Sequence, residues 1–388
     1  MRSRSHVIDL TGNNALISLR VAMVTRFPPS CSGAAQAASS LADALVRYGV
    51  TVEVIRLVQP GEASAFGSPV VMDLNPGWSL SGGVAAIRAN RSDVVVVELE
   101  HEPPVRFTEE LMDRVTAPVL LTLDDIPRRG TPMARAVSAL TENAFTVVVP
   151  STSARERLRE QTEGSIQAEV IPHGSSWSAL EPPCRLRRRI LTWGFLSPGV
   201  GAGRVIRALA LLDDIDPTPQ YRVIGTCHPA RPVDEIARYR DELRKTAVAL
   251  GVSESVGFGP ILHSRQKLLD EIERSDVVAV MYDAVDRTAS RILTEAVSAA
   301  RPVVATRFPG AVEILDGGAG VTVAHDDTVG LAAALRRLLT DDEAYLQAAT
   351  AARSLSATLG WDSVAGRFLD LLVQVASRSE AVDSHASV

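Results

Sequence analysis

The polar residues most suggestive of chemistry lie in one short stretch, RTASRILTEAVSAA, which begins at Arg287. Glu295 stands there on an otherwise apolar predicted helix, where packing does not explain a carboxylate. A carboxylate one turn into a helix can accept hydrogen bonds from two hydroxyl groups. Arg287 and Arg291 lie close to the predicted helix start, where the helix dipole favours anions. The stretch therefore predicts a site for a phosphorylated ligand, although Arg287 could instead pair with Asp283 or Asp286 at the surface.

The elements that would position this stretch are short apolar runs alternating with helical patterns. Strands are predicted at residues 21–25, 52–57, 94–99, 118–123 and 146–150, and again at 189–195, 221–226, 256–258, 277–282, 302–306 and 320–323. Helices are predicted at 34–48, 202–212, 234–250 and 289–300. This alternation predicts an α/β fold with parallel sheets and right-handed crossovers.

The chain has 388 residues, which is too many for one ordinary core and predicts two domains. A Pro-Pro pair and a run of arginines place the seam near residues 176–188. We expect a disordered leader at 1–19, a first Rossmann-like domain at 20–180 and a second at 187–358. An amphipathic helix at 359–377 follows the second unit and is expected to pack back on the first domain. Residues 378–388 are expected to be frayed.

Charge and cysteine content limit the classes of ligand and the cellular location that we expect. A net charge of −6 argues against a nucleic-acid groove, although a local basic patch remains compatible with it. Three scattered cysteines form no disulfide framework and favour a reducing, cytoplasmic location. No metal-ligand cluster and no stretch long enough to span a membrane stands out in the sequence. Open parallel sheets bind ligands at the carboxyl ends of their strands, so two facing sheets would form one deep central cleft.

Six motifs in register resemble glycosyltransferase family 4, a group with the GT-B fold. They are MVTRFPPSCSGAAQAASSLADALVRYGVTVEVI, VVVPSTSARERL with VIPHG, LTWGFLSPGVG, VGFGPILHSRQKLLDEIERSDVVAVMY, RTASRILTEAVSAARPVVATRFPGAVEIL and GWDSVAGRFLDLL. The resemblance runs from about residue 20 to residue 375. It implies two Rossmann-like domains facing a central cleft, with the nucleotide on the second and the acceptor on the first.

The activity implied by the resemblance is transfer of a sugar from a nucleotide-sugar donor, with retention at the anomeric carbon. The acceptor would be an unidentified small molecule, glycan or lipid, bound by first-domain loops such as residues 61–83 and 103–110. The nucleotide-sugar is a co-substrate, and the resemblance implies no metal and no other cofactor.

Donor-site residues carry over from the family pattern onto the second half of the chain. Glu295 matches the glutamate that accepts hydrogen bonds from the ribose hydroxyls. Ser290 and Arg291 match the helix start whose amides face the pyrophosphate. Gly259 lies in the strand-end loop 257–261, which matches the segment that touches the base. Gly194 matches the first glycine of the motif that opens the second domain, although it could be a plain turn residue.

The first half supplies three further candidates. Gly33 matches the loop glycine that lets the backbone approach phosphates, and it could also be an ordinary helix-start glycine. His101 follows the strand VVVVEL, where family members often have a histidine facing the cleft. Asp124 stands where the family has a histidine after the next strand. We take His101 and Asp124 as the catalytic candidates.

Several donor-facing positions depart from the family pattern. Val200 replaces a lysine that clamps phosphate, Phe195 replaces an arginine, and Arg287 replaces the first of two glutamates. Arg287, Arg291, Arg204 or Arg265 could compensate, because arginine binds phosphate bidentately. Three functions therefore stay open: an active transferase with a rearranged clamp, a catalytically silent relative that binds a partner or ligand, and a sugar-nucleotide epimerase. The epimerase ranks last because no acid/base set for it is found.

Overall fold

The computed structural model describes residues 19–30, 32–59, 62, 64, 67–99, 104–177, 188–225, 233–259 and 265–386. The chain forms two compact units. Unit 1 combines Met1–Gly174 with Trp361–Val388, and unit 2 is Ser175–Gly360. The two ends of unit 2 meet, because Ser175 forms a parallel bridge with Gly360 and its amide donates to the carbonyl of Leu359 at 2.7 Å.

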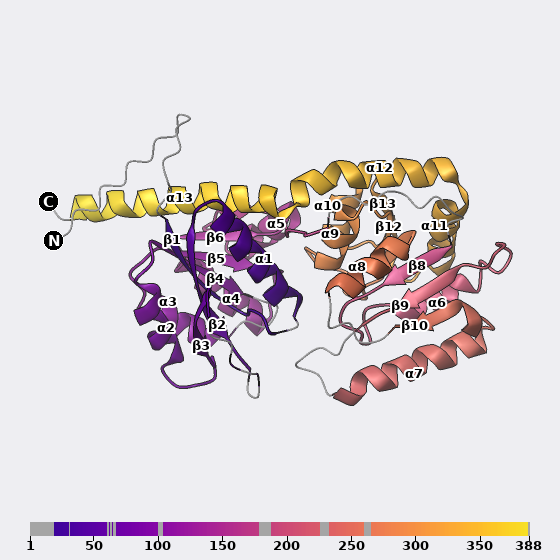
Figure 1. Ribbon diagram of the computed structural model, residues 1–388, viewed down its shortest axis with the longest axis horizontal. Helices are drawn as coiled ribbons and strands as arrows, with labels where there is room; N and C mark the ends of the chain where they lie inside the picture. The colour runs from indigo at the N-terminus through magenta and orange to yellow at the C-terminus, as the bar shows by residue number, and fades with distance from the viewer. Residues whose placement is uncertain are drawn as a thin grey trace. The chain divides into compact units, whose positions relative to one another are not determined.

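Unit 1 is a parallel sheet flanked by helices (Figure 1). Its strands in the described part of the chain are β1 (Arg20–Thr25), β2 (Thr51–Leu57), β3 (Val70–Leu74), β4 (Val94–Leu99), β5 (Val119–Leu123), β6 (Thr146–Val149) and β7 (Ala168–Val170). They lie in the order β3-β2-β1-β4-β5-β6-β7. Its helices there are α1 (Gly33–Arg47), α2 (Ser81–Ala89), α3 (Val105–Met112), α4 (Pro132–Glu142), α5 (Thr152–Gln161) and α13 (Trp361–Ala386).

Both faces of the unit 1 sheet are covered, because alternate strand residues point to opposite sides. On β1, Val21 and Met23 face one side, where α1 and α13 supply the rest of the core. Ala22 and Val24 face the other side, which α2, α3, α4 and α5 cover. The expected packing of the C-terminal helix on the first domain is confirmed, since α13 contacts α1 within this core.

Unit 2 is a second parallel sheet between helices. The described strands are β8 (Arg189–Thr192), β9 (Gln220–Val223), β10 (Val256–Phe258), β11 (Val277–Val280), β12 (Val303–Thr306) and β13 (Gly320–Val323). Their order is β10-β9-β8-β11-β12-β13. The described helices are α6 (Ala202–Leu209), α7 (Val233–Ala249), α8 (Arg265–Arg274), α9 (Arg291–Ser298), α10 (Pro309–Leu315), α11 (Thr328–Thr340) and α12 (Asp342–Leu359).

The unit 2 sheet is doubly covered in the same way. Ile190 of β8 belongs to the core shared with α6, α7 and α11. Its neighbour Leu191 belongs to the opposite core, shared with α8, α9, α10 and α12. The α/β class and two parallel-sheet domains expected from the sequence are therefore confirmed.

Three details differ from the expectations. Residues 61–83 and 103–110 are not simply loops, because they include β3 and the starts of α2 and α3. A buried ion pair joins β3 to β2, since Asp73 of β3 accepts two hydrogen bonds of 2.7 Å from the fully buried Arg56 of β2. Helix α13 continues to Ala386 instead of fraying from residue 378, because no Gly or Pro interrupts that segment.

The expected leader lies almost entirely outside the described residues, which begin at Leu19. Where the chain is described, no helix combines the length and the hydropathy needed to cross a bilayer.

Candidate functional site

The unit 2 sheet has a switch point between β8 and β11. The chain moves outward from β8 to β9 and β10, and then in the opposite direction from β11 to β12 and β13. Ligands of open parallel sheets bind beyond the carboxyl ends of the strands at such a point. The sequence-predicted residue Gly194 follows β8, and Arg287, Ser290, Arg291 and Glu295 all follow β11. The topology therefore brings these five residues to one place.

Ser290 is the N-cap of α9 and is almost completely buried. Its hydroxyl oxygen accepts a hydrogen bond of 3.2 Å from the amide of Leu293, and it lies 3.2 Å from the hydroxyl of Tyr282. These contacts hold the helix start in place. Amides of a first helical turn have no acceptor within the helix, and the helix dipole adds partial positive charge there. The α9 start, including the partly buried Arg291, is thus a suitable place for an anion.

Arg287 presents its guanidinium over the ring of Tyr282, with its carbon 4.4 Å from the ring centre. Among the described residues Arg287 forms no ion pair, so neither Asp283 nor Asp286 is its partner. Its backbone carbonyl accepts a hydrogen bond of 3.2 Å from Gly310. A Cβ on Gly310 would lie 2.4 Å from the carbonyl oxygen of Thr288, so only glycine permits this approach. Arg287 is therefore a cation without a carboxylate partner, held beside the α9 start.

Glu295 lies one turn into α9, facing the end of β8. Its Oε2 accepts a hydrogen bond of 3.2 Å from the indole Nε1 of Trp193. Gly194, the next residue, has φ +118°, and a Cβ there would lie 2.6 Å from Cδ1 of Ile292. The backbone conformation therefore favours glycine at this position, and the residue lies against the side chain of Ile292 in the first turn of α9.

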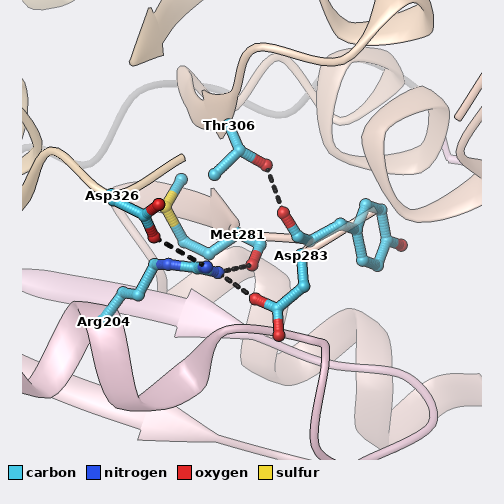
Figure 2. Close-up of polar contacts among 6 residues, drawn as sticks. Arg204, Met281, Asp283, Thr306 and Asp326 are labelled. Atoms are coloured by element: carbon cyan, nitrogen blue, oxygen red, sulfur yellow. Dashed lines mark hydrogen bonds and ion pairs between the residues drawn. The ribbon is translucent and has the colours of Figure 1, made fainter. Parts of the chain in front are cut away.

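The first turn of α6, at the end of the loop from β8, is fastened to the end of β11 through Arg204 (Figure 2). Arg204 donates to the carbonyl of Met281 at 3.2 Å, forms an ion pair with Asp283, and reaches the carboxylate of Asp326 at 3.5 Å. The amide of Asp283 also donates to the carbonyl of Gly199 at 2.8 Å. Arg204 is therefore engaged by protein acceptors and holds the loop in place, so its guanidinium does not take over the role of the missing lysine.

Val200, which stands at that lysine position, contacts the apolar core of unit 2. The next residue, Gly201, has φ +69°, and a Cβ there would lie 1.8 Å from the carbonyl oxygen of Met281. The loop therefore brings backbone and an aliphatic side chain to the switch point, and positive charge has to come from elsewhere.

Gly259 lies apart from the other donor-site candidates, at the end of the edge strand β10. Arg240 of α7 donates to the carbonyl of Gly259 at 3.0 Å and to that of Gly225 at 3.2 Å, which joins the ends of β10 and β9. Burial, and to a smaller extent Arg244, lowers the pKa of Arg240. Gly259 thus shares the carboxyl edge of the sheet with Gly194, and Arg240 determines the position of its carbonyl.

Two of the three unit 1 candidates, Gly33 and Asp124, lie among the described residues, each next to a strand or helix end. Gly33 is the exposed first residue of α1, whose N-cap Ser32 accepts a 3.0 Å hydrogen bond from Ala35. Asp124 directly follows β5, is partly buried, and its amide donates to the carbonyl of Leu99 at 3.2 Å. His101 lies outside the described residues, so its catalytic role and that of Asp124 stay predictions.

Sequence reasoning missed three residues that shape the site: Trp193, Tyr282 and Arg240. The sequence could have indicated Trp193 as a site residue, because it is one of only four tryptophans and directly precedes Gly194. No local pattern marks Tyr282 or Arg240, whose contacts come from folding.

Comparison with known proteins agrees with this geometry. Residues 187–341 match the family model described as "Glycosyl transferases group 1". Among curated proteins, D-inositol 3-phosphate glycosyltransferase of Corynebacterium diphtheriae is 30% identical over 175 residues, which are 44% of this chain and 39% of that protein. The corresponding protein of Corynebacterium glutamicum is 30% identical over 193 residues, 49% of this chain and 44% of its own length. The chain thus spans about two fifths of the curated relatives it matches.

Solved structures resemble nearly the whole chain. Sucrose-phosphate synthase from Thermosynechococcus elongatus superposes with a TM-score of 0.75 at 18% identity, covering 93% of this chain and 100% of that one. Anabaena HepE in complex with UDP and glucose superposes with a TM-score of 0.72 at 17% identity, covering 92% and 100%. At these identities the likeness concerns the fold. The chain has the GT-B fold, and residues 187–341 of its second unit match a group 1 glycosyl transferase domain.

Proposed function

We propose that this protein is a glycosyltransferase that takes a sugar from a nucleotide-sugar donor bound on unit 2 and retains the configuration of the anomeric carbon. The acceptor, a small molecule, glycan or lipid, would bind on unit 1. In this reaction the bond between the anomeric carbon and the diphosphate oxygen breaks. The acceptor oxygen forms the new bond to that carbon and loses its proton, and the nucleoside diphosphate leaves.

One observation carries the proposal: the α9 start combines a helix N-terminus suited to an anion, an adjacent cation without a carboxylate partner among the described residues, and a carboxylate one turn further on. Arg287 and the first-turn amides of α9 would stabilise the negative charge that develops on the departing diphosphate. Glu295 would accept hydrogen bonds from the ribose hydroxyls. The whole constellation falls within the residues that match the group 1 model. Positive charge is assigned here to side chains and helix amides, so no metal enters the proposal.

A second candidate is a protein that binds a nucleotide-sugar without transferring the sugar. Val200 favours it, because an aliphatic side chain packed against the core replaces a cation at the phosphate loop. Binding and transfer assays separate the two candidates.

The first experiment is thermal unfolding of the full chain with UDP, GDP, ADP, TDP and their sugars. A ligand at 100 times its Kd stabilises the folded state by about 2.7 kcal/mol. For a unit of this size, that corresponds to a Tm increase of roughly 5–10 °C. No increase with any of these nucleotides would contradict the proposed site. Stabilisation without release or transfer of sugar, measured with radiolabelled donors, would favour the silent alternative.

A further inference from the structure

Trp193 has an unusual position at the proposed donor site. It comes directly after β8, and its side chain is only 6% exposed. Its indole Nε1 donates to Glu295 Oε2 across 102 positions of sequence. A buried indole N–H usually has an acceptor, but here that acceptor is the one carboxylate to which we assign ligand binding.

The fold requires Trp193 to face α9. Leu191 and Trp193 are two residues apart at the end of β8, and both belong to the core shared with α9. The contact between Gly194 and Ile292 adds a second close approach of the same two segments. The indole ring of Trp193 is buried in this core, so it has little freedom to rotate. It can therefore fix the direction of the Glu295 carboxylate, to which it donates.

We propose that Trp193 is a positioning residue, which orients the Glu295 carboxylate toward the ribose hydroxyls and thereby gives the site its preference for ribonucleotides. A carboxylate offers about four acceptor positions, and the indole hydrogen bond occupies one of them. This inference rests on the proposed function, since it assumes that a nucleoside diphosphate binds at the α9 start.

The test measures Kd by calorimetry for UDP and 2′-deoxy-UDP, and likewise for the GDP and ADP pairs, using the full chain. With the unmodified protein the 2′-deoxy ligand is expected to bind about tenfold more weakly, because it lacks one hydrogen bond to a charged group. Trp193→Phe removes the indole N–H. We expect it to weaken the ribonucleotide severalfold and to weaken the deoxynucleotide, which keeps only the 3′-hydroxyl, by less, and so to reduce the ratio of the two Kd values.

Trp177→Phe is the matched control, because Trp177 is equally buried and belongs to the same apolar cluster. It is expected to leave the ratio of Kd values unchanged. An unchanged ratio in Trp193→Phe would overturn the inference, and so would an equal reduction in both tryptophan variants. A protein that binds nucleoside diphosphates without any ribose preference would overturn the inference while the proposed function stands. Failure of every nucleoside diphosphate to bind would overturn both.

If Trp193→Phe does not fold, the indole N–H resonance of Trp193 in the unmodified chain provides the answer. The resonance can be assigned by elimination, from Trp→Phe variants at the other three tryptophans. We expect the Trp193 resonance to move in Glu295→Gln, and to move more on addition of UDP than of 2′-deoxy-UDP. Equal responses to the two nucleotides, or none in Glu295→Gln, would overturn the inference.

Discussion

Arg287→Gln should separate binding of the diphosphate from binding of the nucleoside. Arg287 is partly buried beside the α9 start, stacks on Tyr282, and forms no ion pair with a described residue. A hydrogen bond to a charged group contributes about 1.5–3 kcal/mol. Loss of one such bond raises Kd by roughly 10- to 100-fold. We therefore expect a loss of this size for the nucleoside diphosphate that binds best, and no change for the corresponding nucleoside.

The assay is calorimetric titration at two salt concentrations, because removal of a cation that binds phosphate also weakens the salt dependence of affinity. Arg287→Lys keeps the charge but not the planar fork, so it should recover part of the affinity. Arg244→Gln is the matched control: Arg244 also stacks on an aromatic ring of unit 2, 5.0 Å from the centre of Phe258, but it is paired with Asp241. Unchanged diphosphate affinity in Arg287→Gln, or an equal loss for the nucleoside, would refute the reasoning.

Three further predictions concern stability and loop geometry. Asp73→Asn should destabilise unit 1 by about 3–5 kcal/mol in urea unfolding, because it neutralises the carboxylate bound to buried Arg56, and a loss under 1 kcal/mol would contradict this. Gly201→Ala should destabilise unit 2 by more than about 2 kcal/mol and abolish nucleotide stabilisation in the same thermal assay, because its Cβ would meet a carbonyl oxygen at φ +69°. The hydrogen bond from Arg336 lowers the pKa of Asp214, so this pair stabilises the fold above the ordinary carboxyl pKa of about 4, and the effect disappears as the pH falls through the lowered pKa. Arg336→Gln should accordingly lower Tm at pH 7, and the decrease should become smaller as the pH falls through the lowered pKa of Asp214; a decrease that does not change with pH would argue against the pairing.

The central strands could be predicted from the sequence because they are buried on both faces and therefore continuously apolar. VVVVEL at Val94–Leu99 is the clearest case. The edge strands β3 and β7 were missed for the converse reason. β3 is only partly buried and carries Asp73, and β7 is three residues long, so neither has a continuous apolar run.

Part of the candidate site, too, could be predicted from the sequence, and part depends on contacts between distant segments. Ser290 and Glu295 are separated by one helical turn, so their relation follows from local geometry that the sequence already contains. The environment of Arg287 does not follow from local geometry alone, because its backbone carbonyl is held by the amide of Gly310, which lies 23 positions further along the chain. The contact between Trp193 and Glu295 likewise depends on the relative placement of a strand and a helix far apart in sequence.

The meeting of Ser175 with Gly360 has a consequence for the order in which the protein is made. In the sequence, unit 2 is inserted between the two segments of unit 1. The two ends of unit 2 are joined by the hydrogen bond of 2.7 Å from the amide of Ser175 to the carbonyl of Leu359. All of its strands and helices in the described part of the chain are synthesised before α13. Unit 1, by contrast, lacks part of the cover on one face of its sheet until Val364, Phe368 and Leu372 of α13 have been made, because α1 covers only the rest of that face. During translation, therefore, unit 2 can fold before unit 1 is complete, while part of one apolar face of the unit 1 sheet stays uncovered until α13 has been made.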